Sequence, residues 1–262
     1  MDLMLSRDEL LLVASMFKRT HVPGLELNPA EASLAPAEQQ RRRQVAAYSL
    51  RQRGIAKMAD GKPQVHASVL SLVGICAHAQ KTVVVHQLDA ANKAARAVVH
   101  TLGKDAVLRR MTAPDIYKLT GLPDQKAIVT ELLTLMAANG VPEPAPMSIS
   151  LADDGLNAGR EAARAGDISA ARSAFARAGA DAGAARALAG FFSSAHTLSM
   201  VHVMQAQAAS LNIQGVTIAT GSASAWLMVE LAGQPAASRR WSLMAVSTDT
   251  LRKFWEGITR EA

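Results

Sequence analysis

The chain has 262 residues, of which 49% are hydrophobic and 19% are charged, and it carries a formal net charge of +6. This length and composition predict a folded globular protein with a well-buried core. No stretch holds the roughly 18 to 20 uninterrupted apolar residues that cross a bilayer, and the apolar run at residues 10–17 has no basic leader, so we expect neither a membrane span nor a secretion signal. The single Cys76 excludes an intramolecular disulfide and multi-cysteine zinc sites, and we therefore expect a cytoplasmic protein.

The positive charge gives limited support to nucleic-acid binding. Its only dense cluster consists of Arg41, Arg42, Arg43, Arg51, Arg53 and Lys57. A cluster of this kind usually lies on a solvated helix face. Aromatic residues make up only 4% of the chain, so the stacking surfaces of single-strand binders are nearly absent, which argues against RNA binding.

A capping box opens the first predicted helix. Ser6 and Glu9 have the spacing at which each side chain accepts a hydrogen bond from the other residue's backbone N–H. The apolar stripe that follows, at residues 10–17, has helical spacing and predicts a helix over residues 8–18. Pro23-Gly24 then separates this helix from the next one.

A helix, a short hairpin and a second helix are predicted between residues 36 and 78. Pro36 favours the first turn of a helix that Gly54 ends, and Asp60-Gly61 favours a tight turn. The two strands of the hairpin and the following buried helix are expected at residues 55–58, 64–65 and 67–78. The same order of elements occurs in winged-helix DNA-binding domains.

From residue 81 the pattern changes to short β-favouring runs separated by turn residues. The runs that predict an antiparallel meander lie at residues 83–85, 97–99, 106–111 and 116–122. Pro123-Asp124 then opens a helix with a buried apolar stripe, and Asn139-Gly140 ends it. The first unit therefore spans residues 1–140.

Alternating prolines at residues 141–147 predict an extended linker between two units. The second unit, at residues 148–262, begins with alanine-rich helices and continues with strands and a terminal helix that follows Thr248-Asp249. The helices are expected at residues 156–164, 169–178 and 182–192, and the strands at residues 197–204, 216–220, 225–231 and 241–246.

Both units have the same order of helices, meander and closing helix. Placing Asp124 over Asp249 aligns Leu119 with Met244, so the repeat is also visible at the level of residues. We therefore predict an α+β fold of two units related by a pseudo-twofold axis, with each half-sheet covered by helices.

No motif typical of an enzyme is present. Cys76 lies among apolar residues, which raise a thiol pKa and suppress the reactive thiolate. A hairpin centred on Lys93 would place His86 opposite His100, but a zinc site needs at least three protein ligands and Asp89 is the only further candidate nearby. We expect no catalytic residue, cofactor or metal.

Several features carry a resemblance to a known family when they are taken in chain order. The apolar helix at residues 10–17 is followed by Val22-Pro23-Gly24-Leu25, by the segment LRQRGI at residues 50–55 and by Gly61 with its helix. Together with the valine strand and the doubled α+β layout, these features resemble the EspG proteins of type VII (ESX) secretion. The resemblance implies a cytosolic adaptor that holds the helical tip of a PE-PPE substrate pair, keeps it soluble and delivers it for export.

The resemblance also implies a binding site. In that family a loop between sheet strands and the helical region of the second half meet the partner. On this sequence the loop lies at residues 89–95, which makes Asp89, Asn92, Lys93 and the nearby Arg96 the expected partner-binding residues. A binding protein of another kind on the same scaffold is equally compatible with the sequence.

DNA binding by a winged helix is the alternative. The helix at residues 36–53 would then be the recognition helix, and the hairpin at residues 55–65 would be the wing. The DNA-binding residues would be Arg41, Arg42, Arg43, Lys57 and Lys62. This alternative leaves the whole second unit unexplained, so we favour protein binding.

Overall fold

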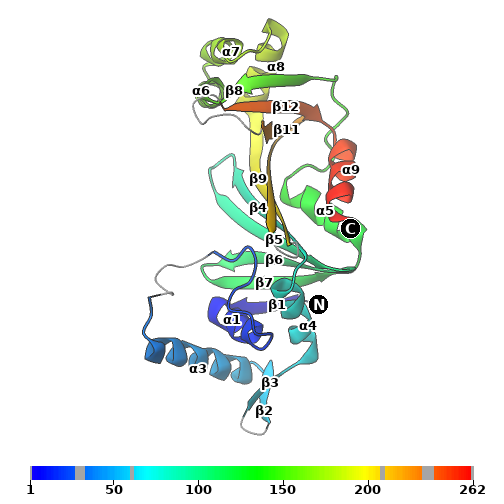
Figure 1. Ribbon diagram of the computed structural model, residues 1–262. Helices are drawn as coiled ribbons and strands as arrows, with labels where there is room; N and C mark the ends of the chain where they lie inside the picture. The colour runs from blue at the N-terminus through cyan, green and yellow to red at the C-terminus, as the bar shows by residue number, and fades with distance from the viewer. Residues whose placement is uncertain (1, 27–32, 60–61, 207–209, 232–238, 261–262) are drawn as a thin grey trace.

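Ten strands form one continuous antiparallel sheet in the computed structural model, which describes residues 2–26, 33–59, 62–206, 210–231 and 239–260 (Figure 1). The order across the sheet is β1-β7-β6-β5-β4-β9-β10-β11-β12-β8. The predicted α+β class is confirmed. No helix among the described residues is long and apolar enough to span a membrane.

The first half of the chain contributes one end of this sheet. Its elements are β1 (Asp2–Ser6), α1 (Arg7–Ser15), α3 (Pro36–Gln52), β2 (Ala56–Ala59), β3 (Lys62–Val65), α4 (Ala67–Ala77), β4 (Lys81–Asp89), β5 (Ala94–Leu102), β6 (Asp105–Ala113), β7 (Ile116–Leu122) and α5 (Gln125–Leu135). Strands β2 and β3 pair only with each other, as the predicted hairpin requires. The turn expected at Asp60-Gly61, and the side chain of Lys62, lie outside the described residues.

The second half of the chain contributes the other end of the sheet. Its elements are β8 (Ser148–Ala152), α6 (Asp153–Arg164), α7 (Ile168–Arg177), α8 (Ala182–Ser194), β9 (Ala195–Ala206), β10 (Leu211–Gly221), β11 (Ala225–Glu230), β12 (Arg240–Val246) and α9 (Thr248–Thr259). From its outer edge to the centre this half runs β8-β12-β11-β10-β9, which parallels β1-β7-β6-β5-β4 in the first half. The pseudo-twofold axis and the boundary at residues 141–147 stay predictions.

The residue alignment expected between the two halves is wrong by two positions at the closing helices. Asp124 caps α5 by accepting a hydrogen bond from the Ala127 N–H, whereas the equivalent cap of α9 is Ser247, which accepts from Thr250. Asp124 therefore corresponds to Ser247 and not to Asp249. Capping geometry is invisible to an alignment of apolar patterns, because several residues near each helix start can serve as the cap.

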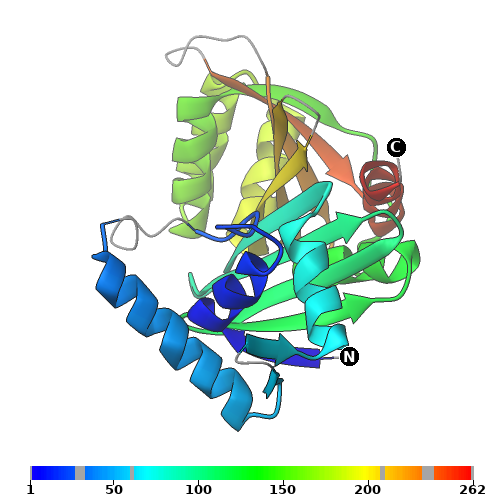
Figure 2. The ribbon, with the colours of Figure 1, turned by 60° about the horizontal axis from the view of Figure 1, so that its bottom comes forward.

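The two faces of the sheet are covered differently. On one face α5 and α9 lie side by side over the middle of the sheet, and Leu132 and Trp255 are fully buried there against strands from both halves (Figures 1 and 2). On the opposite face α1 and α4 cover the first-half strands, and α6, α7 and α8 cover the second-half strands. The halves therefore share one core and also have one separate core each.

Two strands were not predicted, and both lie at the edges of the sheet. Strand β1 pairs with β7, and β8 pairs with β12. Each strand has only five residues and is followed at once by a helix. A window of this length is too short for hydrophobic periodicity to separate a strand from the helix that follows.

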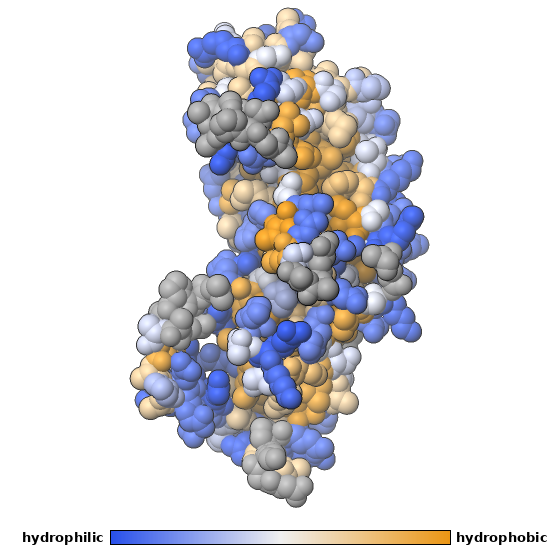
Figure 3. Space-filling view, in the orientation of Figure 1, coloured by the Kyte–Doolittle hydropathy of each residue, from blue (hydrophilic) through white to orange (hydrophobic). Residues whose placement is uncertain are grey.

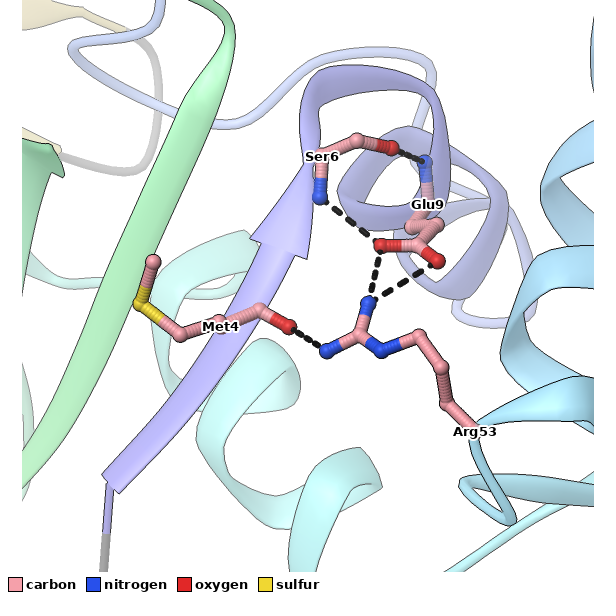
Figure 4. A network of polar contacts seen from close by, with 4 residues as sticks. All are labelled: Met4, Ser6, Glu9 and Arg53. Atoms are coloured by element: carbon pink, nitrogen blue, oxygen red, sulfur yellow. Dashed lines mark hydrogen bonds and ion pairs between the residues drawn. The ribbon is translucent and has the colours of Figure 1, made fainter. Parts of the chain in front are cut away.

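An ion pair between Arg53 and the buried Glu9 joins α1 and α3 (Figure 4). The capping box at Ser6 and Glu9 is confirmed, and the Glu9 carboxylate, only 2% exposed, also accepts hydrogen bonds from Arg53 Nη1 at 2.8 and 3.0 Å. Arg53 Nη2 donates to the Met4 carbonyl. Arg53 reaches these partners because α3 ends at the position predicted, where Gly54 takes a φ of +66°. The ion pair fixes the end of α3 against α1, while the rest of α3 extends along the outside of the molecule (Figure 2).

The shared core predicts that both halves unfold together. Leu119→Ala, at a fully buried position of the first half, should lower the free energy of unfolding by about 2 to 5 kcal/mol because it leaves a cavity. The three tryptophans, Trp226, Trp241 and Trp255, all lie in the second half. Their fluorescence should therefore show the same lowered denaturation midpoint as far-UV circular dichroism.

Met244→Ala, at a position that is 43% exposed, is the matched control and should change the midpoint little. A midpoint that falls in circular dichroism but not in tryptophan fluorescence would show that the halves unfold independently.

Candidate functional site

On the face that carries α1 and α4 at one end and α6 to α8 at the other, β9 leaves Met200 and His202 exposed among the described residues, whereas Val84 on the neighbouring β4 is buried beneath residues 22–26. In Figure 1 these two helical layers lie at opposite ends of the molecule, and β4 and β9 lie between them. Strand pairing places His86 beside Met200 and Leu88 beside Leu198 on this face. Met200 is 41% exposed. We call the surface formed by His86, Leu88, Leu198, Met200 and His202 the central face.

A pocket adjoins the central face where the β4–β5 loop meets the second-half helices. Its volume is about 210 Å³. Its apolar and basic lining residues include Leu88, Arg160, Arg164, Phe192, His196 and Leu198. The Arg160 guanidinium lies 5.9 Å from the centroid of the Phe192 ring, and burial lowers the pKa of Arg160. This junction pocket therefore combines apolar walls with two cationic groups.

The β4–β5 loop is held in a fixed shape by its own first residue. The Asp89 carboxylate accepts hydrogen bonds from the backbone N–H groups of Ala91 and Lys93 at 2.9 and 2.8 Å. Asn92 takes a φ of +58°, and its Oδ1 accepts a hydrogen bond from Arg164 Nη2 at 2.5 Å. The loop is therefore attached to α6, which brings the two regions expected to bind a partner next to each other.

The four predicted partner-binding residues have different environments. Asp89, Asn92 and Lys93 are all exposed, but the side chains of Asp89 and Asn92 shape and anchor the loop, whereas only the backbone of Lys93 takes part in the turn. Arg96 lies within β5 and not in the loop, donates from Nη2 to the Gly24 carbonyl at 2.9 Å and pairs with Glu26. Of the four, Lys93 is the side chain best placed to meet a partner directly.

The predicted juxtaposition of His86 and His100 is wrong. His86 pairs across the strands with Arg96, and His100 pairs with Thr82. The hairpin is centred on Ala91 and not on Lys93, because the hydrogen bonds of Asp89 close the turn earlier. Among the described residues no group of three or more histidine, cysteine or acidic side chains could hold a metal ion.

His86 has a different neighbour, His202 on β9, and the centroids of the two rings lie 6.3 Å apart. Partial burial lowers the pKa of His86, and the electrostatic effects of the nearby Arg96 and His202 act in the same direction. None of His202, Met200, Arg160 and Arg164 was expected from the sequence to be a binding residue. Nothing in the sequence pattern pairs β4 with β9, so no local signal could have brought these residues together.

The basic residues of the DNA-binding alternative lie on separate elements, and the three arginines of α3 do not all face the same way. Arg41, Arg42 and Arg43 are consecutive on α3 and therefore point in directions about 100° apart. Arg42 lies 3.4 Å from the Asp8 carboxylate. Lys57 is exposed on β2. DNA binding stays a prediction of the sequence.

A second exposed apolar surface lies on β10. Strand β11 pairs with β10 only from Thr217 to Thr220, so the first half of β10 has a free edge within the described part of the sheet. Leu211 and Ile213 on this edge are 58% and 55% exposed. Figure 3 shows hydrophobic residues gathered at mid-height, where Figure 1 places β10. This edge and the central face are both typical of surfaces that bind other proteins.

Comparison with known proteins finds a match in structure only. No protein-family model matches the chain, and no curated protein matches its sequence. Among solved structures, the chain is similar to the Mycobacterium tuberculosis type VII secretion system chaperone EspG5, solved in complex with a PE25-PPE41 dimer. The TM-score is 0.64 at 13% sequence identity, and the match covers 98% of this chain and 95% of the other. The whole chain therefore has the fold of that chaperone.

The burial of His100 predicts how the stability of the protein depends on pH. Its pKa lies well below the ordinary value of 6.5, chiefly because of burial and secondarily because of Arg109. The folded state therefore binds fewer protons than the unfolded state below pH 6.5, and the free energy of unfolding should fall as the pH is lowered below that value. One such group contributes at most about 1.4 kcal/mol per pH unit.

His100→Leu should remove this contribution, and it should fold well because neither ring nitrogen has a hydrogen-bond partner among the described residues. Chemical denaturation between about pH 7.5 and 5.5 measures the slope. An unchanged slope in the variant would contradict the assignment to His100.

Proposed function

We propose that this protein is a non-enzymatic adaptor that binds a helical protein and holds it for export, as a secretion chaperone does. The observation that carries the proposal is the fold similarity, along 98% of the chain, to a chaperone solved with a PE25-PPE41 dimer. The resemblance found in the sequence, to the EspG proteins, points to the same family independently of the coordinates. An adaptor of this kind would act in the cytosol before export.

The central face, the junction pocket and the β4–β5 loop form the proposed docking surface. They offer apolar contacts from Leu88, Leu198 and Met200 beside the guanidinium groups of Arg160 and Arg164. The end of a helix in a partner presents apolar side chains together with backbone carbonyls that have no partner within the helix. The negative end of its dipole is stabilised by nearby cations. The chemistry of this surface therefore suits the tip of a helical protein.

The surroundings of the chain's one thiol support a role that is not catalytic. Cys76 is fully buried, and burial raises the pKa of its thiol to about 12. A thiol with this pKa is protonated at neutral pH and is a poor nucleophile.

Two exposed methionines on opposite faces of the sheet allow a matched test of the docking surface. Met200, on the central face, is 41% exposed, and Met244, on the other face, is 43% exposed. The immobilised chain should capture a helical protein from the cytosol of its native cell. Met200→Glu should then weaken binding of the purified partner by about tenfold or more in calorimetry, because it places a carboxylate in an apolar contact.

Met244→Glu should leave the affinity unchanged. If capture retrieves no helical protein, the adaptor proposal fails. If both variants bind as tightly as the unchanged chain, the partner binds elsewhere, and the free edge of β10 becomes the next surface to test.

Charge reversal at Lys93 tests the loop separately. Lys93 is exposed, and only its backbone takes part in the turn, so Lys93→Glu should leave the fold intact. We expect it to weaken partner binding several-fold at low salt and less at high salt, because added ions screen exposed charges. Lys104→Glu, at an exposed position in the turn between β5 and β6, is the control. Equal affinities for the two variants would argue against a role for the loop.

A further inference from the structure

Three arginines line one cavity in the first half of the molecule. The cavity has a volume of about 240 Å³ and lies between the start of α1, strands β5 and β6, and residues 22–26. The arginines are Arg7, Arg96 and Arg109. Gly24 helps to form one wall, since its φ of +63° brings the backbone so near the sheet that a Cβ there would lie 3.0 Å from Val84.

Arg109 is the unusual member of this group because it is buried without a carboxylate. Its side chain is 2% exposed, and its guanidinium lies 5.3 Å from the centroid of the Tyr117 ring. Nη2 donates to the Pro23 carbonyl at 3.2 Å, whereas Nε and Nη1 have no hydrogen-bond partner among the described residues. A buried charge with unused donors is costly, and proteins normally pair it with an opposite charge.

The charges around Arg109 increase this cost. Burial lowers the pKa of Arg109 to about 10, and the nearby positive charges of Arg96 and Arg7 act in the same direction. With this pKa the guanidinium stays protonated at neutral pH. An anion between the three groups would relieve the repulsion and also accept the unused hydrogen bonds.

The two carboxylates near the cavity do not neutralise its deepest arginine. Glu26 pairs with Arg96, and its side chain is 72% exposed, so its charge lies at the mouth of the cavity. The backbone carbonyl of Glu26 accepts a hydrogen bond from Arg7 Nη2 at 2.7 Å. Asp115 also lines the cavity, but no ion pair joins it to Arg109 in the described part of the chain. The Nε of Arg96 also has no hydrogen-bond partner among the described residues.

We propose that this cavity binds a small oxyanion, a phosphate or a carboxylate, on Arg109 and Arg96. The planar fork of a guanidinium presents paired N–H donors that match two oxygens of such a group. The volume is below the roughly 300 to 1,000 Å³ of pockets for drug-sized ligands, which suits a small anion. Glu26 competes with the ligand for Arg96. The site adjoins the central face, because Arg96 pairs across the strands with His86, but the anion proposal does not depend on the proposed function.

The test uses the full-length chain with inorganic phosphate and with acetate, each against potassium chloride at equal ionic strength. A ligand that binds the folded state raises the Tm as its concentration increases. We expect phosphate or acetate to raise the Tm beyond chloride, and the stronger of the two identifies the ligand class. Calorimetry then gives the affinity of the stronger anion for each variant.

Arg109→Met should lower this affinity by about tenfold or more, since it removes charge-assisted hydrogen bonds. The variant is expected to fold, because methionine has a similar volume and removes the desolvation cost of a buried charge that no described carboxylate pairs. Arg110→Met is the control, since Arg110 is the next residue along β6 and pairs with Glu131 at 2.5 Å. The affinity of Arg110→Met for the anion should equal that of the unchanged chain.

Glu26→Gln should raise the affinity several-fold, because it removes the competing carboxylate. A purely structural role of the arginines predicts no such gain. The proposal is overturned if neither anion raises the Tm beyond chloride, or if Arg109→Met and Glu26→Gln both bind the anion with the affinity of the unchanged chain.

Discussion

The antiparallel pairing of β4 with β9 is the interaction on which the rest of the structure depends. It runs without a break from Lys81 opposite Gln205 to Asp89 opposite Thr197 and joins the two half-sheets into one. Because neighbouring strands share their faces, the pairing also aligns the two halves. One face then carries the core beneath α5 and α9, and the other carries two helical layers with exposed residues of β9 between them. The central face exists because these layers are far apart.

The two faces of the sheet therefore differ in what covers them. The covered face holds the molecule together, since strands from both halves contribute to one apolar core there. The opposite face leaves residues of β9 exposed between the helical layers, where we propose that a partner binds, and Arg164 attaches the β4–β5 loop to α6 beside them. A surface formed on paired strands changes shape little, which lowers the conformational entropy lost when a partner binds.

Much of the fold follows from local signals in the sequence. The Ser6 capping box, the stop at Gly54 and the Asp124 cap each act over a few residues, and they predicted three helix ends correctly. The site could be predicted only in part. The loop at residues 89–95 was expected from a resemblance, but Met200 joins the site through the pairing of β4 with β9, and Arg164 joins it through a side-chain hydrogen bond from α6 to Asn92. The predicted register of the β4–β5 hairpin was wrong for a similar reason. Asp89 sets the register through side-chain hydrogen bonds, which leave no periodic pattern in the sequence.

The central claim is that a partner binds the central face. Its most direct test is the oxidation of the methionines by dilute peroxide, compared between the free chain and its complex with the captured partner. Exposed methionines report on separate surfaces: Met200 on the central face, Met244 on the opposite face, and Met58 on the β2–β3 hairpin. Oxidation converts the apolar thioether to a sulfoxide and requires access to the sulfur. The partner should slow the oxidation of Met200 and leave the oxidation rates of Met244 and Met58 unchanged. Protection of Met58 or Met244 while Met200 oxidises at its original rate would contradict the central claim.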